Sequence, residues 1–328
     1  MITSRGFRIK ILWLMGKDNI VKSFLLSLLV VILYDFFDVK FLAVPSILLA
    51  SIGTAVAFYV GFKNNQAYDR LWNASKIWES IYSNSRSLFI QLNNWIKDED
   101  EKRHFIQMHI VYLQILKLEL RKQVSWNRTN EKYLSINNLL GIKEVGYEEE
   151  MDKILKKYAL FSWKEALLSK SNKATYALNK QFEWMFELSS RIEIAENEYS
   201  ELLKNLNELN RLQSASETFK YTPLYRQYSI FSSIFINLFN FLLPFSLLAE
   251  FDKTVSWGSW LTIPFTMLVS WVFYTMEQIG DISENPFENS AVDIPIDFIC
   301  NQIENEICEI CDMKGLGINI AEPSNILM

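Results

Sequence analysis

The sequence predicts an all-α protein that is divided between a membrane and water. Three stretches without any charged residue are long enough to cross a bilayer, whose apolar core takes roughly 20 helical residues. The long segment between the second and third stretches is rich in charge and patterned like amphipathic helix. With 10 Gly and 7 Pro in 328 residues, the chain has too few turn formers for a β-sandwich or a doubly wound α/β fold.

Four membrane-spanning helices are expected. The three charge-free stretches are Phe41–Phe62, Tyr228–Ala249 and Thr254–Met276. A fourth segment, Ser23–Phe37, is shorter, but its core FLLSLLVVILY is too apolar for a surface helix. We therefore expect it to span as well, with Asp35 at the far interface.

The basic residues predict how these helices are oriented. Five of them precede the first span against the single acid Asp18, whereas the loops after the first and third spans each carry one Lys beside two acids. Cytoplasmic flanks of membrane proteins are enriched in Lys and Arg. We expect both termini and the middle segment to be cytoplasmic, in a multi-pass protein of the inner or plasma membrane. No signal-peptide cleavage site follows the first apolar run.

The cytoplasmic part is predicted to be helical. Apolar residues recur at three- and four-residue spacing in Phe105–Val124, along a leucine-rich helix that runs up to Glu217, and in a final helix Ile296–Met313. The stretch Trp126–Tyr147 is expected to be irregular. The predicted organisation is an N-terminal part with two spans (1–62), a cytoplasmic helical region (63–227), two further spans (228–276) and an acidic segment with the last helix (277–328).

Composition argues against several functions. A net charge of −5 gives no support for nucleic-acid binding. Cys300, Cys308 and Cys311 lie late in the chain, without a second pair or a nearby His, so we expect reduced thiols in a core rather than a zinc or redox site. His104 and His109 are five residues apart and do not resemble a metalloprotease motif. With no nucleotide-binding or nucleophile motif visible, we expect no enzyme and no cofactor.

The second span runs without a strong helix-breaking signal into GFKNNQAYDRLWNASKIWESIYSNSRSL, residues Gly61–Leu88. Apolar helix passes directly into amphipathic helix there, with only Gly61 at the junction. We expect one long helix that crosses the membrane and enters the cytoplasm. The alternating aromatic and basic residues are also compatible with a helix packed in an oligomer whose charges are solvated.

This stretch resembles the signature of prokaryotic bestrophins, in which a GF(R/K)N core leads into an Ala-Tyr-Asp-Arg-like run and a Trp-rich helix. Two further matches follow in the same order. Lys220-Tyr221-Thr222-Pro223-Leu224 is similar to the link before the family's third span. The sequences EQIG at 277–280, ENPF at 284–287 and DIPID at 293–297 are similar to the segment after its fourth span.

The resemblance implies a homopentamer around one axial pore that is lined in the membrane by the second span. The family's narrow neck consists of three residues spaced four apart, which fall here on Thr54, Phe58 and Phe62. This spacing places them close to one helix face. Five copies of each Phe would form a hydrophobic constriction that can gate by dewetting, while Thr54 would make the outer neck wetter. Without the resemblance, Phe side chains facing lipid or a neighbouring helix would be the simpler interpretation.

Two further sites are implied by the resemblance. A cytoplasmic aperture falls near Tyr199 or Ser200. The calcium clasp of animal members falls on Asn285 and Asp293, but Ser290 stands where a further carboxylate is expected. Because Ca²⁺ prefers six to eight oxygen ligands, the segment is interpreted as a structural belt, with Ca²⁺ binding as the alternative.

The resulting hypothesis is a passive pentameric channel for small monovalent ions, with chloride and other anions favoured by the family resemblance. The alternative within this architecture is a sodium-selective cation channel, because aromatic ring edges favour anions whereas a chain of net charge −5 favours cations. The alternative from another class is a membrane-anchored scaffold or sensor that conducts nothing.

Overall fold

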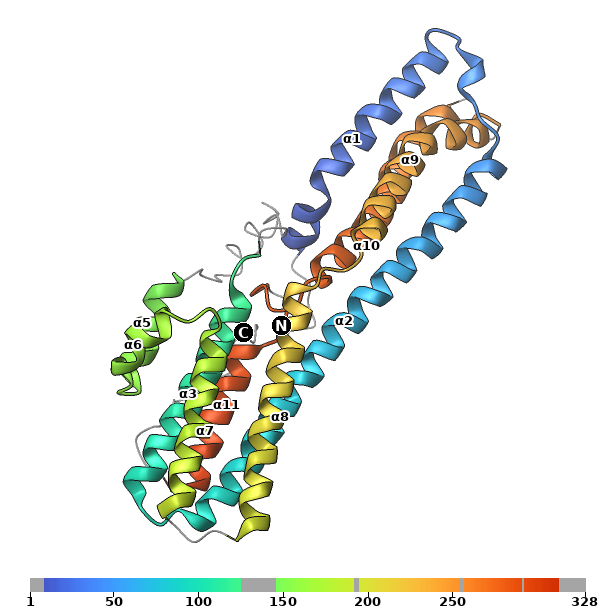
Figure 1. The fold of residues 1–328 in the computed structure, drawn as a ribbon. Helices are drawn as coiled ribbons and strands as arrows, with labels where there is room; N and C mark the ends of the chain where they lie inside the picture. Colours follow the sequence, from blue (N-terminus) through green and yellow to red (C-terminus); the bar gives the residue numbers. More distant parts are fainter. Residues whose placement is uncertain (1–8, 125–145, 192–194, 254–256, 291, 313–328) are drawn as a thin grey trace. The chain divides into compact units, whose positions relative to one another are not determined.

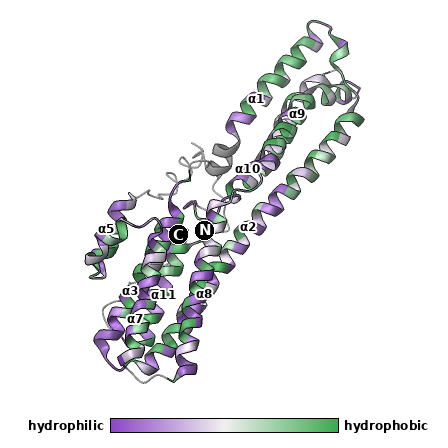
Figure 2. Ribbon diagram, in the orientation of Figure 1, coloured by the Kyte–Doolittle hydropathy of each residue, from purple (hydrophilic) through white to green (hydrophobic). Residues whose placement is uncertain are grey.

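The computed structural model describes residues 9–124, 146–191, 195–253, 257–290 and 292–312, and within these ranges the chain is helical with no strand (Figure 1). Its contacts divide it into two compact units. The apolar unit comprises Arg5–Arg70 and Pro223–Asn285; the polar unit comprises Leu71–Thr222 and Pro286–Met328 together with the first four residues. The helices of the apolar unit are coloured mostly as hydrophobic, whereas hydrophilic and hydrophobic residues mix along the helices of the polar unit (Figure 2).

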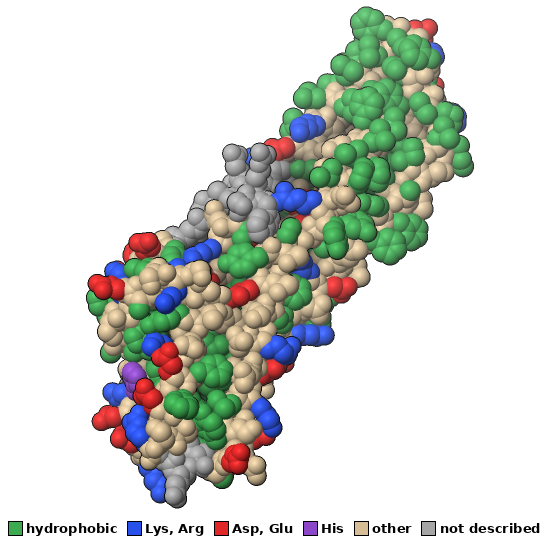
Figure 3. Space-filling view, viewed as in Figure 1, with side chains coloured by type: hydrophobic (Ala, Val, Ile, Leu, Met, Phe, Trp, Pro, Cys, Tyr) green, Lys and Arg blue, Asp and Glu red, His purple; other side chains and the backbone are tan. Residues whose placement is uncertain are grey.

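The apolar unit is built from four long helices. They are α1 (Ile9–Asp35), the first part of α2 (Ser46–Trp95), α9 (Arg226–Phe251) and α10 (Thr262–Ser283), with short 3₁₀ turns at Lys40–Leu42 and Gly258–Leu261. Helix α10 packs against both α1 and α9. Hydrophobic side chains of the apolar unit crowd the surface that Figure 3 presents, whereas charged side chains are spread over the polar unit.

Two of the described helices, α2 and α9, lie in ranges that are long and apolar enough to cross a membrane, Lys40–Trp95 and Glu196–Phe251. Only 11% of the most apolar window of the first range is buried, so α2 does not resemble the core helix of a soluble protein. The four-span arrangement therefore stays a prediction, and residues 254–256, where the last span was expected to begin, lie outside the described ranges.

Helix α2 is continuous over 50 residues, as the sequence predicted. It begins directly after Pro45 and contains no further proline, so nothing interrupts its backbone hydrogen bonds. At about 1.5 Å per residue it is roughly 75 Å long, more than twice the thickness of an apolar bilayer core.

The polar unit contains the rest of α2 and six further helices, with a 3₁₀ turn at Phe161–Trp163. The helices are α3 (Glu99–Arg121), α5 (Tyr147–Lys157), α6 (Lys164–Leu168), α7 (Lys173–Arg191), α8 (Glu196–Tyr221) and α11 (Ile296–Ile310). The predicted leucine stripe of α8 is buried, and so are Ile303 and Ile307 of α11. Residues 126–145 and Met313, about which the sequence also made predictions, lie outside the described ranges.

Some helix ends differ from the predictions. Helix α3 begins six residues before Phe105, at Glu99, because the Asp98 side chain accepts a hydrogen bond of 2.9 Å from the Asp100 backbone N–H and caps the helix. Helix α8 continues past Glu217 to Tyr221. Hydrophobic periodicity identifies these helices, whereas a polar side-chain cap that the periodicity does not include sets where α3 begins.

The three cysteines are buried free thiols, as predicted. Burial raises the pKa of Cys300 to about 12 and the pKa of both Cys308 and Cys311 to about 11. Since the thiolate is the reactive and metal-binding form, these thiols behave as small hydrophobic core groups near neutral pH.

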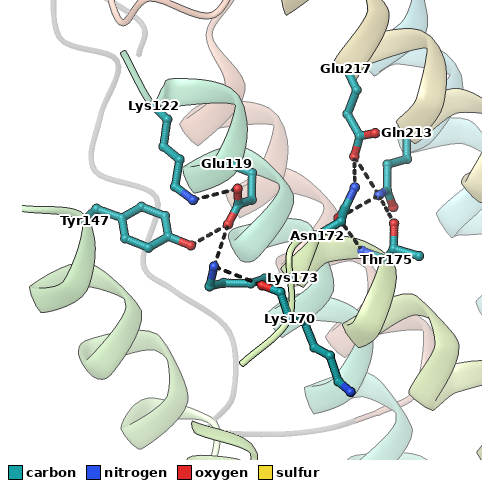
Figure 4. A network of polar contacts seen from close by, with 9 residues as sticks. All are labelled: Glu119, Lys122, Tyr147, Lys170, Asn172, Lys173, Thr175, Gln213 and Glu217. Atoms are coloured by element: carbon teal, nitrogen blue, oxygen red, sulfur yellow. Dashed lines mark hydrogen bonds and ion pairs between the residues drawn. The ribbon is translucent and has the colours of Figure 1, made fainter. Parts of the chain in front are cut away.

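Polar contacts connect neighbouring helices of the polar unit (Figure 4). Glu119 of α3 is nearly buried; it accepts a hydrogen bond from the Tyr147 hydroxyl at the start of α5 and pairs with Lys122 at 2.8 Å. In a second group, Gln213 of α8 donates to Thr175 of α7 at 2.8 Å. These contacts join α3, α5, α7 and α8 and give the network a structural role.

His109 connects three helices inside the core. Its imidazole is fully buried, with Nδ1 2.8 Å from Gln181 Oε1 and Nε2 2.9 Å from the Ser85 hydroxyl. With its proton on Nδ1, the neutral ring donates to Gln181 and accepts from Ser85. Burial lowers the pKa of His109 from 6.5 to about 4, and the Gln181 contact offsets only part of that shift.

The unfolding free energy should therefore fall in acid. The unfolded chain binds a proton on this His below about pH 6.5, whereas the folded chain does so only near pH 4. We expect His109 to lower the unfolding free energy by about 2 kcal/mol between pH 7.5 and 4.5. Denaturant unfolding of wild type and His109→Gln at both pH values should show a flatter pH dependence in the variant. His104→Gln, at an exposed position, is the control; equal slopes for wild type and His109→Gln would contradict the prediction.

Candidate pore-lining face

One face of α2 in the apolar unit is exposed and carries the three residues predicted for the neck. Thr54, Phe58 and Phe62 line an open groove together with Ala57, Gly61 and Asn65. Phe58 is 66% exposed and Phe62 is 67% exposed. Each is a large apolar side chain that does not contribute to the core of its own unit.

The opposite face of α2 is packed against α9. Val56 and Val60 are buried in a cluster with Ile236 and Phe239 of α9. Gly53 allows this close approach, since a Cβ atom there would lie 2.8 Å from the Phe239 ring. This packing fixes which face of α2 is covered and leaves the aromatic face without a partner in the described part of the chain.

The Thr54 side chain offers the groove less hydrogen-bonding capacity than a free hydroxyl would. Its hydroxyl donates a hydrogen bond of 2.9 Å to the Ala50 carbonyl one turn earlier in the same helix. The proton is therefore engaged, and only acceptor capacity remains on the groove side. The expected wetter outer neck would rest on that oxygen alone.

Lys63 follows Phe62 directly but points into the protein. Its side chain is fully buried and forms a hydrogen-bonded ion pair with Asp281 of α10. The neighbouring Asn64 donates from Nδ2 to the Met276 carbonyl at 2.9 Å. Together these contacts attach the GFKN segment to α10.

Gly280 completes this attachment. A Cβ atom at position 280 would lie 2.1 Å from the Asn64 Oδ1 atom, so any other residue there would have to displace the Asn64 amide from its contact with α10. The sequence alone does not connect these residues, although GFKN and EQIG both belong to the separated matches to the bestrophin pattern.

A family profile of bacterial and fungal bestrophin proteins matches residues 17–309. The chain belongs to this bestrophin family. The voltage-dependent anion channel-forming protein YneE of Escherichia coli K12 is 24% identical over 307 residues, covering 93% of this chain and 89% of YneE. A voltage-dependent anion channel-forming protein of a Nostoc species is 26% identical over 292 residues, covering 86% of this chain and 81% of that protein.

The fold agrees with solved structures of the family. A crystal structure of a bacterial bestrophin homologue from Klebsiella pneumoniae superposes with a TM-score of 0.71 at 20% identity, covering 90% of this chain and 98% of that one. A second crystal structure of a Klebsiella pneumoniae homologue, which carries a single mutation, gives a TM-score of 0.73 over 90% of this chain and 98% of that one, also at 20% identity. These likenesses establish the bestrophin fold of the single chain.

The residues predicted for the cytoplasmic aperture of this bestrophin lie in the first turns of α8. Ser200 is exposed, and Tyr199 is half-buried against the core of the polar unit. They belong to a different compact unit from the α2 groove. Their role at an aperture stays a prediction.

The two residues predicted for a calcium clasp in this bestrophin belong to different compact units, Asn285 to the apolar unit and Asp293 to the polar unit. Asp293 is buried, and its carboxylate accepts hydrogen bonds from the backbone N–H groups of Phe287, Asn289 and Ile294 at 2.7–2.9 Å. The described residues include no group of three or more His, Cys, Asp or Glu placed to hold a metal ion.

Asp293 thus holds a loop. Phe287 and Asn289 both have a positive φ, 72° and 58°, a conformation that side-chain-bearing residues seldom adopt. Burial raises the pKa of the Asp293 carboxyl, and the backbone N–H groups lower it by a smaller amount. This geometry gives Asp293 a structural role within its own loop.

Removing the buried ammonium of Lys63 should destabilise this bestrophin. In Lys63→Met, Asp281 loses its charged partner, and we expect the unfolding free energy to fall by about 2 kcal/mol, below the usual loss for a buried pair because Asp281 is 33% exposed. Thermal unfolding of the detergent-solubilised protein measures the change.

Two further variants define this test. Lys63→Met combined with Asp281→Leu should recover part of the loss, because an apolar pair replaces the ionic one. Lys40→Met removes an exposed pair with a nitrogen-to-oxygen distance of 3.5 Å and should change stability by less than about 0.5 kcal/mol. Wild-type stability in Lys63→Met would show that the ion pair is not required.

Proposed function

We propose that the chain is one subunit of a pentameric bestrophin channel that passes small monovalent anions such as chloride down their gradient. The observation that carries this proposal is the exposed aromatic face of α2. Large apolar side chains there remain uncovered, while the opposite face is packed against α9. In a ring of subunits, this face would line a shared pore.

Phe58 and Phe62 are proposed as the gate of that pore. They lie four residues apart and stand out from the same side of the helix, so five copies of each would form two stacked apolar rings. A narrow apolar constriction excludes water and with it hydrated ions until it widens. Thr54 would lie at the outer end of this neck.

The relatives support anions as the permeant species, because the E. coli and Nostoc proteins are both named as voltage-dependent anion channel-forming proteins. They also support a membrane location. We further propose that four helices span the lipid bilayer of a cell membrane and that both termini lie in the cytoplasm. The cytoplasmic aperture is proposed near Tyr199 and Ser200. The basic residues before the first span and the long apolar helices support this topology.

The gate can be tested by flux. Purified protein in liposomes should conduct chloride, and Phe58→Ala with Phe62→Ala should raise the flux about tenfold, the change that accompanies a barrier lower by about 1.4 kcal/mol. The control is Phe241→Ala on α9, which removes an exposed Phe of similar size away from the α2 groove and should leave the flux unchanged. Absence of flux from both wild type and the double variant would rule out the channel and favour a membrane-anchored scaffold or sensor.

A further inference from the structure

The exposed face of α2 continues beyond Phe62 with polar residues. Asn65 lines the same groove as Phe58, and Asp69 follows one turn later; both side chains are exposed. Asn65 is seven residues after Phe58, and Asp69 is seven residues after Phe62. Seven residues are almost two whole turns, so each polar residue lies nearly in line with one of the aromatic rings.

Asn65 lies one turn before Asp69 and contacts its carboxylate. The Asn65 Nδ2 atom donates a hydrogen bond to Asp69 Oδ2 at 3.3 Å. An amide donor orients a carboxylate without neutralising it, because it carries no charge. The pair therefore presents a charged carboxylate, oriented by a weak hydrogen bond, on the exposed face.

Asp69 forms no ion pair within the described part of the chain. Among the described residues, no Lys, Arg or His nitrogen lies within 4.0 Å of its carboxylate, in contrast to Asp281, which pairs with Lys63. The next basic residue at matching helical spacing is Lys76, seven residues further along α2. At about 1.5 Å per residue this is roughly 10 Å along the helix, about one Debye length in physiological salt, so Lys76 offsets Asp69 only in part.

We propose that Asp69, oriented by Asn65, determines charge selectivity by placing a ring of carboxylates next to the aromatic neck, where it lowers the permeability of anions relative to cations. This inference rests on the proposed function, since it needs five copies of α2 around a pore. Five like charges at one level would repel a passing anion and concentrate cations in the adjoining vestibule. The channel would then favour anions less strongly than its aromatic rings alone would allow.

The test is the reversal potential of reconstituted channels in a planar bilayer under a NaCl gradient. In Asp69→Asn, which keeps the size of the side chain and removes the charge, we expect the permeability ratio of Cl⁻ to Na⁺ to rise about fivefold at low salt. Asp69→Glu keeps the charge and should retain the wild-type ratio. Asp38→Asn is the matched control, since it removes an exposed carboxylate that precedes α2 and does not line the groove.

A second measurement needs no variant. Because the Debye length falls to about 3 Å at 1 M salt, the wild-type permeability ratio of Cl⁻ to Na⁺ should rise with ionic strength at a constant gradient. A conducting wild type whose ratio does not change with salt, or an Asp69→Asn channel with the wild-type ratio, would overturn the role of Asp69 and leave the proposed channel standing. A wild type that conducts no ions would overturn both.

Discussion

The apolar unit depends on the ion pair between Lys63 and Asp281. An ammonium without a partner is very costly to bury, so α2 and α10 must meet with these two residues in contact. At the same place the Asn64 amide donates to a carbonyl of α10, and Gly280 of α10 has no side chain to keep the two helices apart. Since Lys63 is held on the inner side of α2, Phe62 is held on the outer side. The orientation of the aromatic face thus depends on this buried charge together with the packing of α2 against α9.

Much of this arrangement follows from local sequence, but its polar details do not. The continuity of α2 could be predicted because an apolar run passes into an amphipathic one without a proline, and the buried leucines of α8 follow from their spacing. Lys63 could not be placed in the same way. A lysine directly after an apolar span indicates an interface, and its partner is 218 residues away in the chain.

The candidate site residues could likewise be predicted only in part from the sequence. Spacing places Phe58 and Phe62 near one face, but only the packing of Val56 and Val60 on α9 shows that this face is uncovered. For Asp293 the sequence alone indicates a role that the structure does not show. Its position in an acidic segment is compatible with a metal ligand, whereas its oxygens are engaged by backbone N–H groups of a loop with two residues at positive φ. The hydrogen bonds that Asp293 accepts from these backbone groups cannot be predicted from the spacing of residue types in the sequence.

The adjacency of Phe62 and Lys63 constrains how a pore of this kind could widen. Successive residues in an α-helix are separated by about 100° around its axis, so turning α2 far enough to withdraw Phe62 would also pull Lys63 away from Asp281. Such a rotation would expose the Lys63 ammonium or leave it buried without its partner. Swinging the Phe ring about its own side-chain bonds leaves the ion pair intact and takes only a change of rotamer. A gate at Phe62, as proposed above, would therefore open by movement of its side chains while α2 keeps its contact with α10.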